Sequence, residues 1–142
     1  MMTSIPLFSC SGKRPSNLGI SDSKLAPCPS SPNCLSSDAD DNAHQTAPFQ
    51  LKGTPEHIWD IVRKLVMELP RTHIVTDSPE YLHAECRSSV FGFVDDIELH
   101  LRPADGIIAV RSASRLGHSD FGVNHRRIES LRTALISQGL VR

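Results

Sequence analysis

The chain has 142 residues, with 15 Lys and Arg against 16 Asp and Glu, so its formal net charge is −1 and its pI is near 6.6. This balance excludes nucleic-acid binding through bulk positive charge, and the length fits one domain rather than two. Hydrophobic residues make up 39% of the chain and aromatic residues 5%, which predicts a modest aliphatic core. No apolar run approaches the ~20 residues that a membrane-spanning helix needs.

The N-terminal third, residues 1–47, is predicted to be an irregular Pro/Ser-rich segment, because it has no helical or strand periodicity. Cys10 ends a Leu-x-x-Cys pattern that has the form of a lipoprotein cleavage site. The few residues before it carry no positive n-region and only a short apolar stretch. Two interpretations stay open: the true start lies upstream, or the segment is a vestigial leader of a soluble protein.

Residues 48–142 are predicted to form a single α+β domain. Thr54-Pro55-Glu56 is typical of a helix start, and an apolar stripe at helical spacing follows until Pro70. A second helix is predicted over Asn124 to Gln138. Strands are predicted from alternating runs at Phe49–Lys52, Arg71–Thr76, Tyr81–Arg87, Phe91–Arg102 and Ile107–Arg115.

The short turns between these runs predict an antiparallel four- to five-stranded meander in the order β-α-β-β-β-β-α, with two helices packed on one face. In the third long run, apolar side chains alternate with Asp96, Glu98, His100 and Arg102. This alternation predicts that the other face of the sheet is exposed to solvent. Histidines at positions 57, 73, 83 and 100 are accordingly expected at the surface.

Three further cysteines have to be assigned. Five residues, two of them proline, separate Cys28 from Cys34. A zinc knuckle prefers about two to four intervening residues and needs a second pair of ligands, and only His44 lies nearby. A disulfide is favoured if the compartment is oxidising, and otherwise the two are inert thiols or a redox pair. Cys86 falls on the inward side of its strand and is expected to be a buried small hydrophobe. No metal site and no cofactor are predicted.

The densest polar cluster lies between residues 111 and 127. Strand parity places Arg111 and Arg115 on the face of Asp96, and it places Ser112, Ser114 and Asp95 toward the helices. Cross-strand ion pairs are expected from this arrangement, and an inward Asp95 needs a hydrogen bond or a cation.

The last predicted helix begins with His125, Arg126 and Arg127, which are cations at the positive end of the helix dipole. One interpretation is that Asp120, Asp95 or Asp96 compensates them. The other is an external anion, such as a phosphate, a carboxylate or a lipid headgroup. Arg115, Arg126 or Arg127 would hold it, together with backbone N–H groups at Gly117 and Gly122.

No complete catalytic motif occurs in the chain. The adjacent residues His118, Ser119 and Asp120 cannot easily adopt triad geometry. An enzyme that uses Asp95 or Asp96 with His118 as acid and base is the alternative hypothesis, and a purely structural assembly role is another.

Several motifs together resemble a bacterial and plastid family known as domain of unknown function 1499. They are Leu18-Gly19-Ile20, the run from Leu25 to Ser37, Phe91-Gly92-Phe93-Val94-Asp95-Asp96-Ile97-Glu98, Val110-Arg111-Ser112-Ala113-Ser114-Arg115 and the run from Gly117 into Arg127-Ile128-Glu129. Many bacterial members look like envelope lipoproteins with a longer leader. The resemblance therefore implies a lipidated Cys10, an envelope origin and a Cys28–Cys34 disulfide. This chain departs from the pattern by lacking nearly all of that leader.

The sequence thus predicts a non-enzymatic binding or interaction module of the cell envelope or periplasm, with a cytoplasmic location as the alternative. A small anionic or amphiphilic ligand is expected in an apolar cleft near the start of the last helix. The membrane is expected as a partner only through a lipid anchor, and nucleic acid is not. The candidate ligand-binding residues are Asp95, Asp96, Arg111, Ser114, Arg115, Asp120, Asn124 and Arg127.

Overall fold

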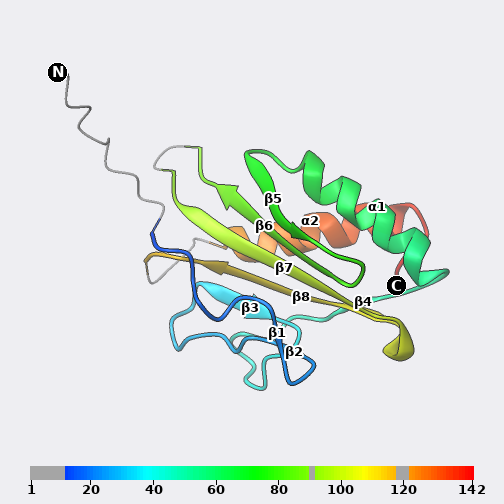
Figure 1. Ribbon diagram of the computed structural model, residues 1–142, viewed down its shortest axis with the longest axis horizontal. Coiled ribbons are helices and arrows are strands. Elements are labelled where there is room, and N and C mark those ends of the chain that lie inside the picture. The colour runs from blue at the N-terminus through cyan, green and yellow to red at the C-terminus, as the bar shows by residue number, and fades with distance from the viewer. Residues whose placement is uncertain (1–11, 90–91, 118–121) are drawn as a thin grey trace.

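A computed structural model describes residues 12–89, 92–117 and 122–142 and shows an α+β fold in which two helices cover one face of a sheet (Figure 1). The elements in chain order are β1 (Ile20–Ser21), β2 (Lys24–Leu25), β3 (Cys34–Ser36), β4 (Phe49–Gln50), α1 (Pro55–Glu68), β5 (Thr72–Asp77), β6 (Tyr81–Arg87), β7 (Val94–Arg102), η1 (Pro103–Asp105), β8 (Ile107–Ser114) and α2 (Val123–Ser137). In this part of the chain, no helix is long and apolar enough to cross a membrane.

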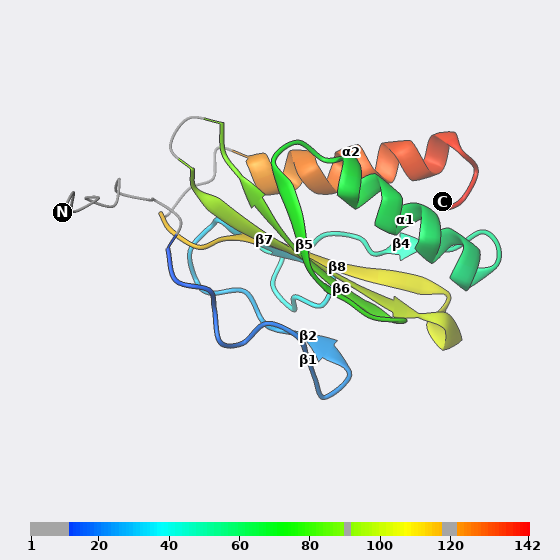
Figure 2. The same cartoon turned by 45° about the horizontal axis from the view of Figure 1, so that its top comes forward.

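The sheet has the strand order β3-β8-β7-β6-β5, and β4 pairs with the other end of β8. Strands β5 to β8 form the predicted antiparallel meander, with Asp95 opposite Ser114 and Glu98 opposite Arg111. The sheet also extends into the segment predicted to be irregular, because β3 pairs with β8 and places Cys34 opposite Ala113. A separate hairpin, β1–β2, lies on the opposite side of the sheet from the helices (Figure 2).

The helices pack on the sheet through the predicted apolar stripes. Pro55 occupies the first turn of α1, where its missing N–H costs no hydrogen bond. Gly122, at φ 78°, precedes α2 in a left-handed conformation that glycine adopts without strain. The core between helices and sheet consists of buried side chains from all these elements, including Phe49, Ile58, Val62, Val66, Leu82, Ile97, Leu99, Ile108, Ile128, Leu131 and Leu135.

The prediction that the other face of the sheet is exposed to solvent was wrong. Asp96 and Glu98 are 1% and 0% exposed, and His83, expected at the surface, is 3% exposed. Residues 12–28 cover this face, and Leu25 is buried there. The alternation of polar and apolar residues correctly separates the two faces, but it does not tell whether a polar face contacts water or ionic partners.

Candidate functional site

Two polar clusters lie at the same end of the sheet, on its opposite faces. Successive side chains of a strand point to opposite faces, so Asp95 points toward α2 and Asp96 points toward the N-terminal segment. The outer cluster consists of Tyr81, His83, Glu85, Asp96, Glu98, Arg111 and Arg115. The inner cluster consists of Asn33, Asp95, Ser112, Ser114, Asn124 and Arg127.

Arg115 and Asp96 form the centre of the outer cluster. Arg115 donates from Nε and Nη2 to the two carboxylate oxygens of Asp96, both at 2.8 Å, and it also contacts Glu85. Nε2 of His83 lies 2.7 Å from Oδ1 of Asp96. Burial alone would raise the pKa of Asp96, but hydrogen bonds from Arg115 and His83 outweigh burial and lower it. Asp96 is therefore an ionised acceptor with saturated contacts.

Glu98 joins the sheet to the segment that covers it. Its Oε1 accepts hydrogen bonds from the Tyr81 hydroxyl at 2.6 Å and from the backbone N–H of Gly19 at 2.8 Å. Burial and the contact with Glu98 raise the pKa of Tyr81, so its hydroxyl stays a donor. Arg111 contacts Glu98 at 3.3 Å and donates to the carbonyl oxygen of Pro27 at 3.3 Å.

The charges of the outer cluster balance. Its carboxylates are Glu85, Asp96 and Glu98. Its guanidinium groups are Arg111, Arg115 and, from the covering segment, Arg14, which contacts Glu85 at 2.8 Å. Buried ions of opposite charge in this geometry compensate one another. Each carboxylate of the cluster consequently has a guanidinium counterion within the protein.

The inner cluster connects α2 with β7 and β8. Arg127 donates to Asp95 at 2.8 Å, to Ser112 at 3.0 Å and to Asn124 at 2.9 Å. The fully buried Asn124 donates to Oγ of Ser114 at 3.0 Å and to the carbonyl oxygen of Asn33 at 3.2 Å. The predicted inward orientation of Asp95 and Ser112 is confirmed. Asp95 supplies an internal acid for one of the cations at the start of α2, Arg127.

Asn33 is a residue of this site that sequence reasoning did not select. Its Nδ2 donates to the carbonyl oxygens of Gly117 at 2.7 Å and Ser114 at 3.3 Å. Its side chain therefore fixes the end of β8 to the loop before β3. The signal was its position directly before Cys34, in the run from Leu25 to Ser37 that carries part of the family resemblance.

The structure does not bring Asp95 and Asp96 into one reaction centre. Each has its own arginine, on its own face of the sheet. His118 and Asp120, the other residues considered for this chemistry, lie outside the described residues. The histidine that contacts Asp96 is His83, which is buried beside it.

The cysteines have separate environments. Cys28 and Cys34 form a disulfide across the loop before β3, with their Cα atoms 5.7 Å apart. Cys86 is buried as predicted, and burial raises the pKa of its thiol. Cys10 lies outside the described residues. Within the described ranges, no three His, Cys, Asp or Glu side chains gather in a way that could hold a metal ion.

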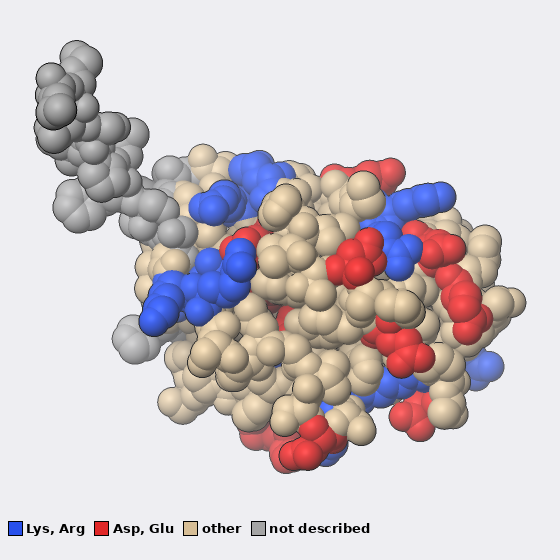
Figure 3. Space-filling view, viewed as in Figure 1, with Lys and Arg blue, Asp and Glu red and all other residues tan. Residues whose placement is uncertain are grey.

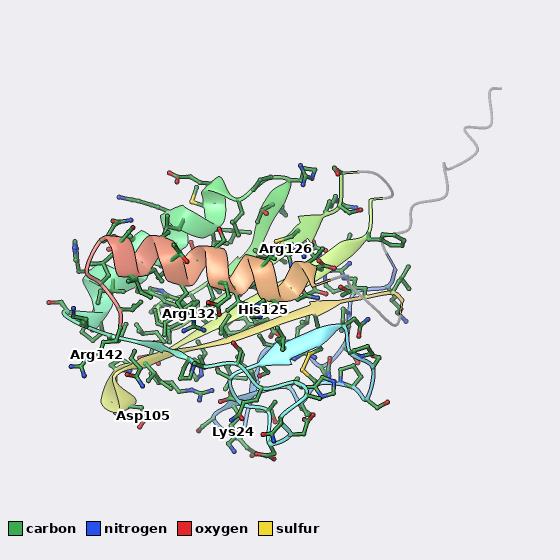
Figure 4. All side chains as sticks on the ribbon, turned by 180° about the vertical axis from the view of Figure 1, so that it is seen from behind. Lys24, Asp105, His125, Arg126, Arg132 and Arg142 are labelled. Atoms are coloured by element: carbon green, nitrogen blue, oxygen red, sulfur yellow. A yellow bond between two sulfur atoms is a disulfide. The ribbon has the colours of Figure 1, made fainter. Side chains whose placement is uncertain are left out.

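A shallow groove runs along the exposed side of α2, away from the sheet. His125 and Arg126 lie at its beginning, on the first turns of the helix (Figure 4). It is lined by His125, Arg126, Glu129, Ser130, Thr133, Ala134 and Ser137. Its open shape and its mixture of charged and small side chains differ from the enclosed apolar pockets that bind small molecules.

Comparison with known proteins assigns the family. The family model described as "Protein of unknown function (DUF1499)" matches residues 24–135. The chain belongs to the DUF1499 family. The matched region of this DUF1499 chain contains the disulfide and nearly all of both polar clusters; of the clusters and their contacts, Arg14 and Gly19 precede it. No curated protein and no solved structure matches the chain. The function of this DUF1499 domain must therefore be argued from its geometry.

Proposed function

We propose that this DUF1499 chain is a non-enzymatic interaction module of the cell envelope, which works in an oxidising compartment. The observation that carries the proposal is the Cys28–Cys34 disulfide. Disulfides persist in periplasmic and secreted proteins, whereas the thiols of cytosolic proteins are kept reduced. The Leu-x-x-Cys pattern at Cys10 supports the same location, because it has the form of a lipoprotein site.

The contacts of the titratable groups favour binding over catalysis. A general acid or base must come within hydrogen-bond reach of the substrate. Glu85 and Asp96 are buried, and burial alone would raise the pKa of both. Their ion pairs outweigh burial and lower both pKa values. Groups that are ionised, buried and paired in this way act as structural ions.

An anionic amphiphile remains the class of ligand that we propose. Arg111, Arg115 and Arg127 contact internal carboxylates, and the cations that we propose for this ligand are exposed ones at the same end of the domain. Arg126, exposed on the first turn of α2, is one of them.

Intact mass spectrometry of the protein from its native host, with and without reduction, tests the location. We expect a gain of two hydrogens on reduction, mapped to Cys28 and Cys34, and a diacylglyceryl adduct on Cys10. An unmodified and fully reduced chain would overturn the proposal and would place the protein in a reducing compartment.

A further inference from the structure

We propose that one end of this domain, where the described chain begins, is a docking surface for a bilayer of anionic phospholipid. The docking surface is defined by exposed cations and exposed apolar side chains. Its members are Lys13, Arg14, Arg71, Arg87, Phe93, Leu116, Val123 and Arg126. This inference rests on the proposed function and names the partner of its exposed cations, but it does not depend on the state of the cysteines.

Backbone contacts place these residues side by side. The N–H of Arg87 donates to the carbonyl oxygen of Arg71 at 3.0 Å, and the N–H of Ser88 donates to that of Phe93 at 2.8 Å. The carbonyl oxygen of Val94, the residue after Phe93, accepts a hydrogen bond from the N–H of Arg115, which directly precedes Leu116. One end of the meander, where β5 and β7 begin and β6 and β8 end, thus carries Arg71, Arg87, Phe93 and Leu116.

The beginning of the described chain and the beginning of α2 lie at the same end of the sheet. The backbone of Gly12 lies against Leu116, since a Cβ at Gly12 would come within 3.0 Å of the Leu116 side chain. Asn33 joins the backbone at Gly117 to the inner cluster, which holds the first turn of α2.

Charge is separated along the molecule. Figure 3 shows Lys and Arg gathered at the end where the described chain begins, whereas the opposite end shows mostly Asp and Glu, with some Lys and Arg between them. In the described ranges, the docking surface has the exposed cations Lys13, Arg71 and Arg87, together with Arg126 and with Arg14, which also contacts Glu85. One exposed carboxylate lies nearby, Glu68 in the last turn of α1. The opposite end contains the β5–β6 and β7–β8 turns. It carries the acids Glu56, Asp60, Asp77, Glu80 and Asp105 together with the cations Lys52, Arg63 and Arg142.

This combination matches a membrane surface of negative charge. The formal net charge of the chain is −1, so the whole molecule has no bulk attraction to anionic lipid. β7 alone has nine residues and spans about 30 Å, several times the Debye length at physiological ionic strength. The local cations therefore act independently of the distant acids. Phe93, Leu116 and Val123, at 40%, 44% and 37% exposed, supply apolar contact at the headgroup boundary.

Cosedimentation with vesicles tests the inference, with the unlipidated chain of residues 1–142. Vesicles of equimolar phosphatidylglycerol and phosphatidylcholine are compared with pure phosphatidylcholine at low and high ionic strength. We expect binding to the anionic vesicles that falls as salt rises. Each cation removed should lower the partition coefficient about fivefold, so Lys13→Gln combined with Arg87→Gln should lower it about 25-fold.

Lys52→Gln combined with Arg142→Gln is the matched control. It changes the net charge equally, but both side chains are exposed at the opposite end, where the backbone next to Lys52 contacts Gly106 (Figure 4). The control should change the partition coefficient less than about twofold. Failure of the wild-type chain to prefer anionic vesicles, or equal losses in both double variants, would overturn the inference. The mass measurement that tests the envelope location is unaffected by either result.

Discussion

Arg115 is buried between two carboxylates, so its contribution to stability is testable. Arg115→Ala would leave Asp96 and Glu85 buried without their main counterion. Breaking a buried ion pair on one side costs about 3 kcal/mol, and we expect a decrease of this size in the free energy of unfolding. Urea denaturation at neutral pH measures it.

Arg87→Ala is the control for this substitution, since it removes the same side chain from an exposed position at the end of β6 in the same sheet. It should change the free energy of unfolding by less than about 0.5 kcal/mol. If Arg115→Ala were equally harmless, the outer cluster would not be a structural network, and Arg115 would be available for a ligand.

At single residues, the sequence allowed prediction of orientation but not of partners. Strand parity correctly placed Asp95 and Asp96 on opposite faces, because alternation is a local property of the backbone. The contact between His83 and Asp96 depends on how β6 is paired with β7. That pairing brings residues 13 positions apart together, and no local pattern specifies it.

At the level of elements, length decided what could be predicted. The two helices and the four meander strands are long enough for a periodic pattern, and they occur near their predicted bounds. β1, β2 and β3 have two or three residues each, too few for periodicity. Their conformation follows from pairing with each other or with β8, which is a tertiary property.

The disulfide stabilises the junction between the covering segment and β3. Cys28→Ser combined with Cys34→Ser opens a loop with a sequence separation of six residues. Loop-closure entropy predicts a decrease of about 2 kcal/mol in the free energy of unfolding. Denaturation with and without reductant checks this. The wild type should lose stability on reduction, whereas the double variant should not respond. A response of the double variant to reductant would contradict the assignment of the effect to this bond.

At the scale of the whole molecule, the sheet is covered on both faces by different kinds of packing. The helices bury an apolar face, and the N-terminal segment buries an ionic one. The ionic face depends on carboxylates that stay charged. Burial alone would raise the pKa values of Asp38, Glu85 and Asp96, but hydrogen bonds from Arg102 to Asp38, and from Arg115 to the other two, lower all three.

These lowered pKa values predict how stability depends on pH. A carboxylate with a lowered pKa in the folded state stabilises that state fully above its unfolded pKa. Its contribution is lost as the pH falls through the folded value. The ordinary values are 3.8 for Asp and 4.5 for Glu, so stability should be flat above about pH 5 and fall steeply below pH 4.5. Urea midpoints measured from pH 7 to pH 3 would show this acid limb.

Asp96→Asn separates the contribution of the outer cluster from general acid unfolding. It removes one carboxylate of lowered pKa, so the variant should be less stable at pH 7 and lose less stability between pH 5 and pH 3. Asp105→Asn is the matched control, because Asp105 is exposed at the opposite end of the sheet. Its acid limb should run parallel to that of the wild type. If the Asp96→Asn curve were also parallel, the charge on Asp96 would not contribute to the acid limb, which would then have to arise from other carboxylates of lowered pKa, such as Glu85 and Asp38.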